Sequence, residues 1–257
     1  MNYTFNTNRF SKLFLKHTRE HYKGYLLSVA VLIGVMVLGG SFLIYMVNVP
    51  IDKNAQTFLF MVLMLLAGTV FTSTIFSDLG DKKSAMPWLT LPASHFEKYL
   101  VAWVYSFLVF LIVYTVIFYL SAISAINIKR FPNYQPYLLN VFEPQILQMY
   151  VIFALLHSIS FFGAIYFEKL HFIKTAVVFF ISIALLILIN KLVLGAFLGR
   201  AVEATPPFGN LLVDDKGQTI EIHILNGMQY SYMLYLIAAL AIIFWVAAYY
   251  RIKEKQV

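Results

Sequence analysis

Cysteine is absent from this sequence of 257 residues, and charged side chains are scarce. The lack of thiols excludes cysteine nucleophiles, zinc–thiolate sites, iron–sulfur clusters and disulfide bonds. Only 12% of the residues are charged and 61% are hydrophobic, whereas an ordinary soluble domain carries about 25% charged residues. A chain this apolar has too little polar surface to cover itself in water. The composition therefore excludes a soluble enzyme and a disordered chain, and it predicts an integral membrane protein.

Six apolar runs follow one another along the chain, each of about 20 residues, the length that crosses a bilayer as a helix. They cover residues 25–47, 58–77, 99–124, 149–167, 175–198 and 230–250. Among the Lys, Arg, Asp, Glu and His residues, only His157 and Lys191 fall inside these runs. The pattern predicts an all-α polytopic membrane protein with six transmembrane helices, built as a single domain over residues 1–257.

Lysine and arginine are unevenly distributed among the connections. If the N-terminus is cytoplasmic, the segments on its side of the membrane carry 13 of these residues and the segments on the other side carry 5. A positive excess stays on the cytoplasmic side, so we expect both termini to be cytoplasmic. The net charge of +7 is then a signal of topology, and we expect no nucleic-acid partner.

The N-terminal segment, residues 1–24, has two chemically different sides when it is drawn as a helix. The cations of one side are Lys12, Lys16, Arg19 and Lys23, and the apolar side holds Phe10, Leu13, Phe14 and His17. This pattern predicts an amphipathic interfacial helix that lies on the lipid bilayer. Its cations would face lipid headgroups or a cytoplasmic partner. The alternative is a generic positively charged anchor.

A helix-capping motif ends the connection at residues 78–98. Ser94 and Glu97 have the spacing of a capping box, in which each side chain accepts a hydrogen bond from the backbone amide of the other residue. Pro92 keeps the residue before it extended. We therefore expect a defined corner, followed by a cleanly started third span.

The same connection contains apolar residues between positions 84 and 91. Ser84 is a candidate N-cap, and Pro87 is compatible with a first helical turn. A short helix that presents Met86, Trp88 and Leu89 would suit recognition by a groove on another protein. The alternative is that Trp88 anchors the connection in the membrane interface, where tryptophan is enriched.

Together, these features resemble a known family. They are the basic amphipathic N-terminus, six spans, a long first cytoplasmic connection ending in LPASHFEK (residues 91–98), a short second cytoplasmic connection and an enlarged last outer connection. The chain resembles bacterial type 2 ATP-binding-cassette (ABC) permeases. The resemblance implies an exporter subunit in the bacterial inner (plasma) membrane. It also implies a second permease subunit, in a homo- or heterodimer, and a cytosolic ABC ATPase subunit.

The resemblance also implies which residues meet the ATPase. They are Lys82, Lys83, Met86, Trp88, Leu89, Leu91 and Glu97 in the first cytoplasmic connection, with Glu168 and Lys169 as a smaller second contact. The chain itself has no phosphate-binding loop, because residues 80–84 lack the glycine spacing that cradles phosphates. We therefore expect no enzymatic activity and no cofactor in this chain, with ATP and Mg on the partner ATPase.

A face of small and hydroxyl-bearing residues marks the second span. Thr69, Thr72 and Ser73 lie on it, and such a face either lines a translocation path or permits close packing of helices. In the resembled family the second and fifth spans flank the path, which makes Asn190 in the fifth span a further candidate.

The two ionisable residues inside the spans are functional candidates by default. For His157 we expect a neutral imidazole hydrogen-bonded to a neighbouring helix; the alternatives are a proton relay or a substrate contact. For Lys191 we expect a side chain that extends to the outer interface. Because no acidic residue lies in the spans, the sequence provides no obvious proton relay.

The outer connection at residues 199–229 contains a candidate β-hairpin over residues 210–224. Ile220, Ile222 and Ile224 alternate with polar residues after an Asp-Lys-Gly turn. Such a hairpin would act as a lid or would cap the spans. Its acidic and histidine residues do not form a metal-binding pattern, so we expect no metal site.

Two other function classes compete with the permease interpretation. An intramembrane enzyme is disfavoured because the spans hold one histidine and no carboxylate. A non-transporting membrane scaffold is the second alternative. Co-purification with an ATPase would distinguish the permease from both.

Overall fold

The computed structural model describes most of the chain. The described residues are 5–47, 52–76, 91–128, 135, 137–200, 202–203, 205–207, 209–215, 218–222 and 228–254. Within them, six helices are long and apolar enough to cross a membrane, which confirms the prediction of a multi-pass helical membrane protein. The elements are α1 (Thr7–Val47), α2 (Lys53–Thr74), α4 (His95–Trp103), η2 (Val104–Val109), α5 (Phe110–Ile128), α6 (Pro144–Tyr166), α7 (His171–Leu198), β1 (Leu211–Asp215), β2 (Gln218–Ile222) and α8 (Met228–Glu254).

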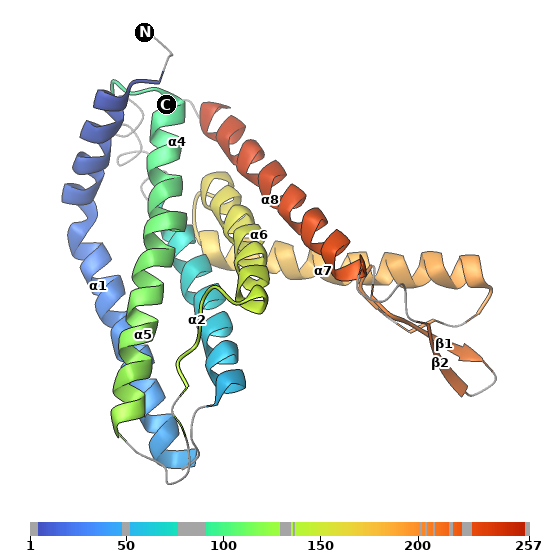
Figure 1. The fold of residues 1–257 in the computed structure, drawn as a ribbon. Helices are drawn as coiled ribbons and strands as arrows, with labels where there is room; N and C mark the ends of the chain where they lie inside the picture. Colours follow the sequence, from blue (N-terminus) through green and yellow to red (C-terminus); the bar gives the residue numbers. More distant parts are fainter. Residues whose placement is uncertain are drawn as a thin grey trace.

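The start of α1, the start of α4 and the end of α8 lie together at one end of the molecule (Figure 1). Helices α4, η2 and α5 form one continuous rod, and η2 is a short π-helical stretch within it. Helix α6 packs against both α2 and α8. In the resulting bundle, α1 and α8 both lie beside α4, where the third span starts.

The N-terminal segment is helical and forms the beginning of a much longer helix. It continues without a break into the first span, so that α1 is one helix of 41 residues. No proline interrupts it, and Gly24 stays in the helix. At 1.5 Å per residue α1 is about 61 Å long, roughly twice the thickness of the hydrocarbon layer. Part of α1 must therefore leave the hydrocarbon or tilt strongly.

Two clusters of buried residues form the core of the part of the chain that the structure describes. The larger joins α1, α2, α5 and α6, and at its centre the rings of Phe60 and Phe118 meet edge to face, with centroids 4.9 Å apart. The smaller lies nearer the chain termini, where Phe76 and Tyr99 both contact the ring of Phe161 on α6. Helix α6 takes part in both clusters and is thus the central element of the bundle.

Hydrogen bonds fix the segment that leads into α6 to the beginning of α2. The Gln56 side-chain amide donates to the Tyr137 carbonyl at 2.8 Å, and its oxygen accepts from the Leu139 amide at 3.1 Å. Lys53 and Tyr137 both contact the Glu143 carboxylate, with Lys53 Nζ at 2.6 Å and the Tyr137 hydroxyl at 2.7 Å. This polar group closes the end of the bundle opposite to the termini.

Helix α7 extends away from the other helices (Figure 1). Thr175, near its start, is its only buried residue, and it lies against Gly163 of α6. Beyond α7, strands β1 and β2 pair antiparallel with Val213 opposite Ile220, and Val213 also forms a bridge with Val202. The connection between α7 and α8 therefore contains a two-stranded unit.

Candidate coupling site at the start of α4

The helix α4 begins with the capping box that the sequence predicts. The Ser94 hydroxyl accepts a hydrogen bond from the Glu97 amide at 3.2 Å, and Glu97 Oε2 accepts from the Ser94 amide at 2.8 Å. These bonds satisfy two backbone amides that an α-helix leaves unpaired at its start. They also hold the Glu97 carboxylate in one orientation.

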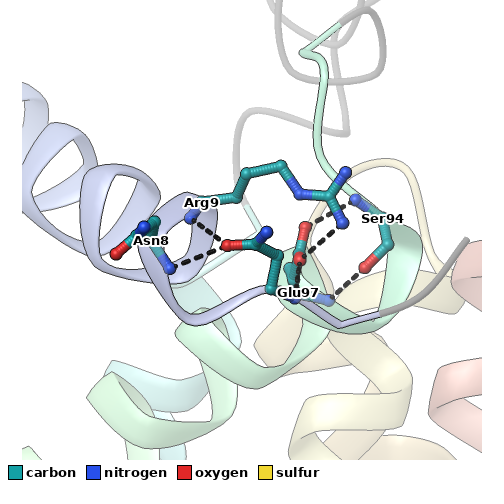
Figure 2. A network of polar contacts seen from close by, with 5 residues as sticks. Asn8, Arg9, Ser94 and Glu97 are labelled. Carbon is teal, nitrogen blue, oxygen red and sulfur yellow. Dashed lines mark hydrogen bonds and ion pairs between the residues drawn. The ribbon is translucent and has the colours of Figure 1, made fainter. Parts of the chain in front are cut away.

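The other oxygen of that carboxylate binds a different helix. Glu97 Oε1 accepts a hydrogen bond from the Asn6 amide at 2.8 Å and another from Arg9 Nη2 at 3.2 Å. Figure 2 shows the Glu97 carboxylate between Arg9 and Ser94. The Glu97 side chain is fully buried, so its charge is compensated by donors from both segments rather than by water.

Asn6 in turn caps the start of α1. Its side-chain oxygen accepts from the amide of Asn8 at 2.9 Å and from the amide of Arg9 at 3.4 Å. Glu97 therefore stands at the beginnings of two helices, where the positive ends of both helix dipoles stabilise a negative charge. One carboxylate ties the starts of α1 and α4 together.

An aromatic seam extends this contact along α1. The Phe14 ring stacks on Tyr105 of η2 with centroids 4.6 Å apart, and Tyr25 stacks on the same ring at 5.4 Å. The hydroxyls of Thr18 and Tyr105 are hydrogen-bonded. The apolar side of the N-terminal segment, expected to lie against lipid, thus packs against another helix of the same chain.

Helix α8 joins the group from the other side of α4. The Tyr99 hydroxyl donates to the Trp245 carbonyl at 3.0 Å. The ring of Tyr249 meets those of Phe96 and Tyr99 edge to face at 6.0 Å and 5.7 Å. Helix α4 is thus fixed to α1 through Glu97 and to α8 through Tyr99.

Most of the predicted ATPase-contacting residues fall outside the described residues, namely Lys82, Lys83, Met86, Trp88 and Leu89. Leu91 is half-buried just before the capping box. Glu168 and Lys169 are exposed in the turn between α6 and α7, whereas the bonds of Glu97 run to α1 and Ser94. Of the predicted residues, only Glu97 is shown at the centre of a polar cluster.

The hydroxyl-bearing face of α2 lies within the bundle. Thr72 and Ser73 are buried, and the hydroxyls of Thr69, Thr72 and Ser73 donate to carbonyls of their own helix. A Cβ added at the neighbouring Gly68 would stand 2.3 Å from the Phe153 ring. This arrangement is that of close helix packing, one of the two interpretations left open by the sequence.

The two remaining polar candidates of the fifth span lie in α7. The Asn190 side chain donates to the Thr205 carbonyl at 2.9 Å, which holds the connection after α7 against the helix. Lys191 is exposed, and its extension to the outer interface stays a prediction.

His157 is hydrogen-bonded to neighbouring helices, as the sequence predicts. Its Nδ1 lies 3.1 Å from Trp245 Nε1 on α8, and its Nε2 lies 2.9 Å from the Ser106 hydroxyl in η2. The indole N–H only donates, so Nδ1 must accept, and the ring proton of the neutral imidazole resides on Nε2. Nε2–H then donates to Ser106, whose hydroxyl donates to the Ala102 carbonyl at 2.8 Å.

Sequence reasoning missed Asn6 and Arg9 as partners of Glu97, and Ser106 and Trp245 as partners of His157. An asparagine directly before a helix is a recognisable N-cap signal, and Asn6 had that position. For Ser106 no local signal existed, because one serine in an apolar run is common. Comparison of the chain with protein-family models, curated proteins and solved structures gives no match.

Proposed function

We propose that this chain is the membrane-spanning permease subunit of a type 2 ABC exporter in the bacterial inner membrane. Both termini are cytoplasmic in this proposal. A second permease subunit completes the path, and a separate cytosolic ATPase subunit binds ATP and Mg. The proposal rests on the sequence resemblance, and one feature of the structure gives it a mechanical basis.

That feature is the set of hydrogen bonds by which Glu97 joins the start of α1 to the start of α4, which we call the Glu97 tie. In the resembled family, the N-terminal helix and the first cytoplasmic connection both touch the ATPase. Here Glu97 follows that connection directly and accepts hydrogen bonds from Asn6 and Arg9 at the start of α1. The two segments expected to receive force from the ATPase are therefore bound to each other by a buried carboxylate.

The tie defines a route for the motion. When the ATPase subunits close, the connection at residues 78–94 moves and carries the start of α4 with it. The Glu97 bonds pass that displacement to α1, and the Tyr99–Trp245 bond passes it to α8. Alternating exposure of a path between two permease subunits then follows from the shift of whole packed helices.

The intramembrane-enzyme alternative gains no support from the Ser106–His157 pair. A serine nucleophile needs a histidine nitrogen that accepts its proton. Trp245 forces the proton onto Nε2, which faces Ser106, so the imidazole donates where a catalytic base would accept. The pair is arranged to join helices.

The test is reconstitution with a bacterial ABC ATPase subunit, which this proposal expects to be encoded beside this chain. We expect co-purification of the two proteins and stimulation of ATP hydrolysis in vesicles. The double substitution Trp88→Ala and Leu89→Ala is expected to leave membrane abundance near normal and to weaken ATPase association, because buried aromatic anchors typically contribute about 2 kcal/mol or more at an interface. Full retention of association and stimulated hydrolysis would reject the coupling role of the connection.

A conservative variant tests the tie separately. Glu97→Gln keeps the side-chain shape but removes the charge that Arg9 and the two helix starts stabilise. We expect normal ATPase binding with reduced stimulation of hydrolysis by the permease. Glu254→Gln, which alters an exposed ion pair with Arg251, is the matched control and should behave like wild type. A scaffold would show neither binding nor stimulation with any variant.

A further inference from the structure

The rod formed by α4, η2 and α5 contains an irregular turn. At the end of η2, the Phe110 amide donates to the Tyr105 carbonyl five residues earlier, whereas an α-helix bonds residues four apart. A π-helical turn of this kind accommodates one more residue than an α-helical turn, and it occurs mostly as a single turn inside α-helices. Its presence changes the rotational relation between α4 and α5.

The His157 hydrogen bonds reach this turn. Ser106 lies inside η2, accepts from His157 Nε2 at 2.9 Å and donates to the Ala102 carbonyl at 2.8 Å. Both Ser106 and His157 are fully buried. A bond between neutral groups in such surroundings costs free energy when it opens, because no water replaces the lost partner.

Aromatic rings pack around His157. Phe107, the residue after Ser106, meets the imidazole edge to face at 5.0 Å and the Trp245 ring at 5.5 Å. Phe161 of α6 stacks on the imidazole at 5.4 Å. The residues that pack around His157 therefore include one from the π-turn itself, and its position depends on that turn.

We infer that η2 is a register switch in which His157 holds the π-turn and thereby sets the rotation of α4, and so of Glu97, relative to α5. If the turn converts to α-helix, α4 rotates by about 100° about the rod axis and moves by about 1.5 Å along it, the increments of one residue. Glu97 then leaves the positions of Asn6 and Arg9. This inference concerns the fold and does not require the proposed transport function.

Distance measurements between spin labels test the switch directly, because the chain has no cysteine. Labels at positions 96 and 112 lie on opposite sides of η2, and Phe96 and Ile112 are both exposed. The geometry of a one-residue rotation lengthens this distance by roughly 3 to 5 Å. A second pair at positions 112 and 123, both within α5, is the control and should not change.

Two substitutions release the turn to different degrees. His157→Phe keeps a ring but removes both hydrogen bonds of the imidazole. Ser106→Ala removes the bond between η2 and α6 and the Ser106 bond to the Ala102 carbonyl, but it leaves His157 bonded to Trp245. In full-length protein reconstituted in lipid, we expect a second, longer 96–112 distance in both variants and a single distance in wild type. A single unchanged distance in Ser106→Ala and His157→Phe would overturn the inference.

A deletion distinguishes a change in helical register from a general loss of packing as the cause of a longer 96–112 distance. Removing Leu108, which is exposed, takes the extra residue out of the turn and should give a regular helix with the wild-type rotation of α4. In that background Ser106→Ala is expected to leave the 96–112 distance at its wild-type value. A longer distance in the combined variant would mean that the serine acts in another way, and would equally overturn the inference.

Discussion

Helices α6 and α7 follow one another in the chain and are both long and apolar, yet they are packed in opposite ways. Helix α6 has nine buried residues and contacts α2, α7 and α8. Helix α7 has one, Thr175, and extends away from the bundle in Figure 1. Length and hydropathy identify both as spans without indicating which one is central.

The difference lies in the kind of residue on each helix. The buried residues of α6 include His157, Ser158, Ser160 and Gly163, which allow close approach or bond across helices. Helix α7 is dominated by large aliphatic side chains that remain exposed. In a membrane, lipid is as apolar as leucine, so small and polar residues mark contacts between helices. Polarity inside a span is thus the better indicator of a central helix.

The largest expected effect comes from breaking the tie that fixes α1 to the bundle. Glu97→Ala removes three hydrogen bonds to a buried carboxylate, those from the Asn6 amide, the Ser94 amide and Arg9. Hydrogen bonds to charged groups typically contribute about 1.5 to 3 kcal/mol each. Glu254→Ala, at an exposed pair, should cost less than about 1 kcal/mol. Unfolding titrations in mixed micelles measure both losses of stability. Equal losses would show that Glu97 contributes no more to stability than an exposed ion pair does.

A matched pair of isoleucines tests the contrast between α6 and α7 itself. Ile165 on α6 is fully buried and Ile189 on α7 is 57% exposed. We expect Ile165→Ala to destabilise the fold by about 2 to 5 kcal/mol and Ile189→Ala by less than about 0.5 kcal/mol. The same unfolding titration applies. A large loss for Ile189→Ala would mean that α7 is packed against protein in the membrane.

The contact between α6 and α7 can be broken at Gly163. A Cβ added there would stand 1.9 Å from Thr175 Oγ1, so Gly163→Ala forces the helices apart and should cost about 1 to 3 kcal/mol. Thr175→Ala in the same chain removes the nearest atoms and should recover part of the loss. Gly34→Ala is the control, because nothing lies within 4 Å of its Cβ position. If the double variant recovers nothing, the steric explanation is wrong.

The smallest expected effect is a pH dependence at the opposite end of the bundle. The hydrogen bond from Lys53, with a further bond from Tyr137, holds the pKa of Glu143 below its ordinary 4.5. A carboxyl group whose pKa is lowered by folding stabilises the fold above its unfolded pKa, and the contribution is lost as the pH falls below it. Melting temperatures of wild type and Glu143→Gln should therefore differ slightly near neutral pH and converge in acid. If the difference in melting temperature stayed the same at every pH, ionisation of Glu143 would not be its cause.

The sequence was sufficient for the six spans because hydropathy is a local signal. It indicated helical structure in the N-terminal segment and again from Tyr25 onward, but not that the two form one helix from Thr7 to Val47. Hydropathy marks where side chains become polar and not where a helical backbone ends. The capping box at Ser94 was also predictable, because its residues are three apart. The bond between Asn6 and Glu97 was not, because the two residues are 91 positions apart and no local pattern encodes such a pairing. The same holds for His157, whose expected bond was correct but whose partners were unknown.

The distance along the chain between Asn6 and Glu97 also sets the order of assembly. The Asn6 amide cannot reach its acceptor until the 91 residues that follow it, up to and including Glu97, have been synthesised. At about 5 to 20 residues per second, the start of α1 waits roughly 5 to 20 s for Glu97. Closure of this contact is therefore a long-range step that requires the chain to be synthesised through the first two spans and into the start of α4.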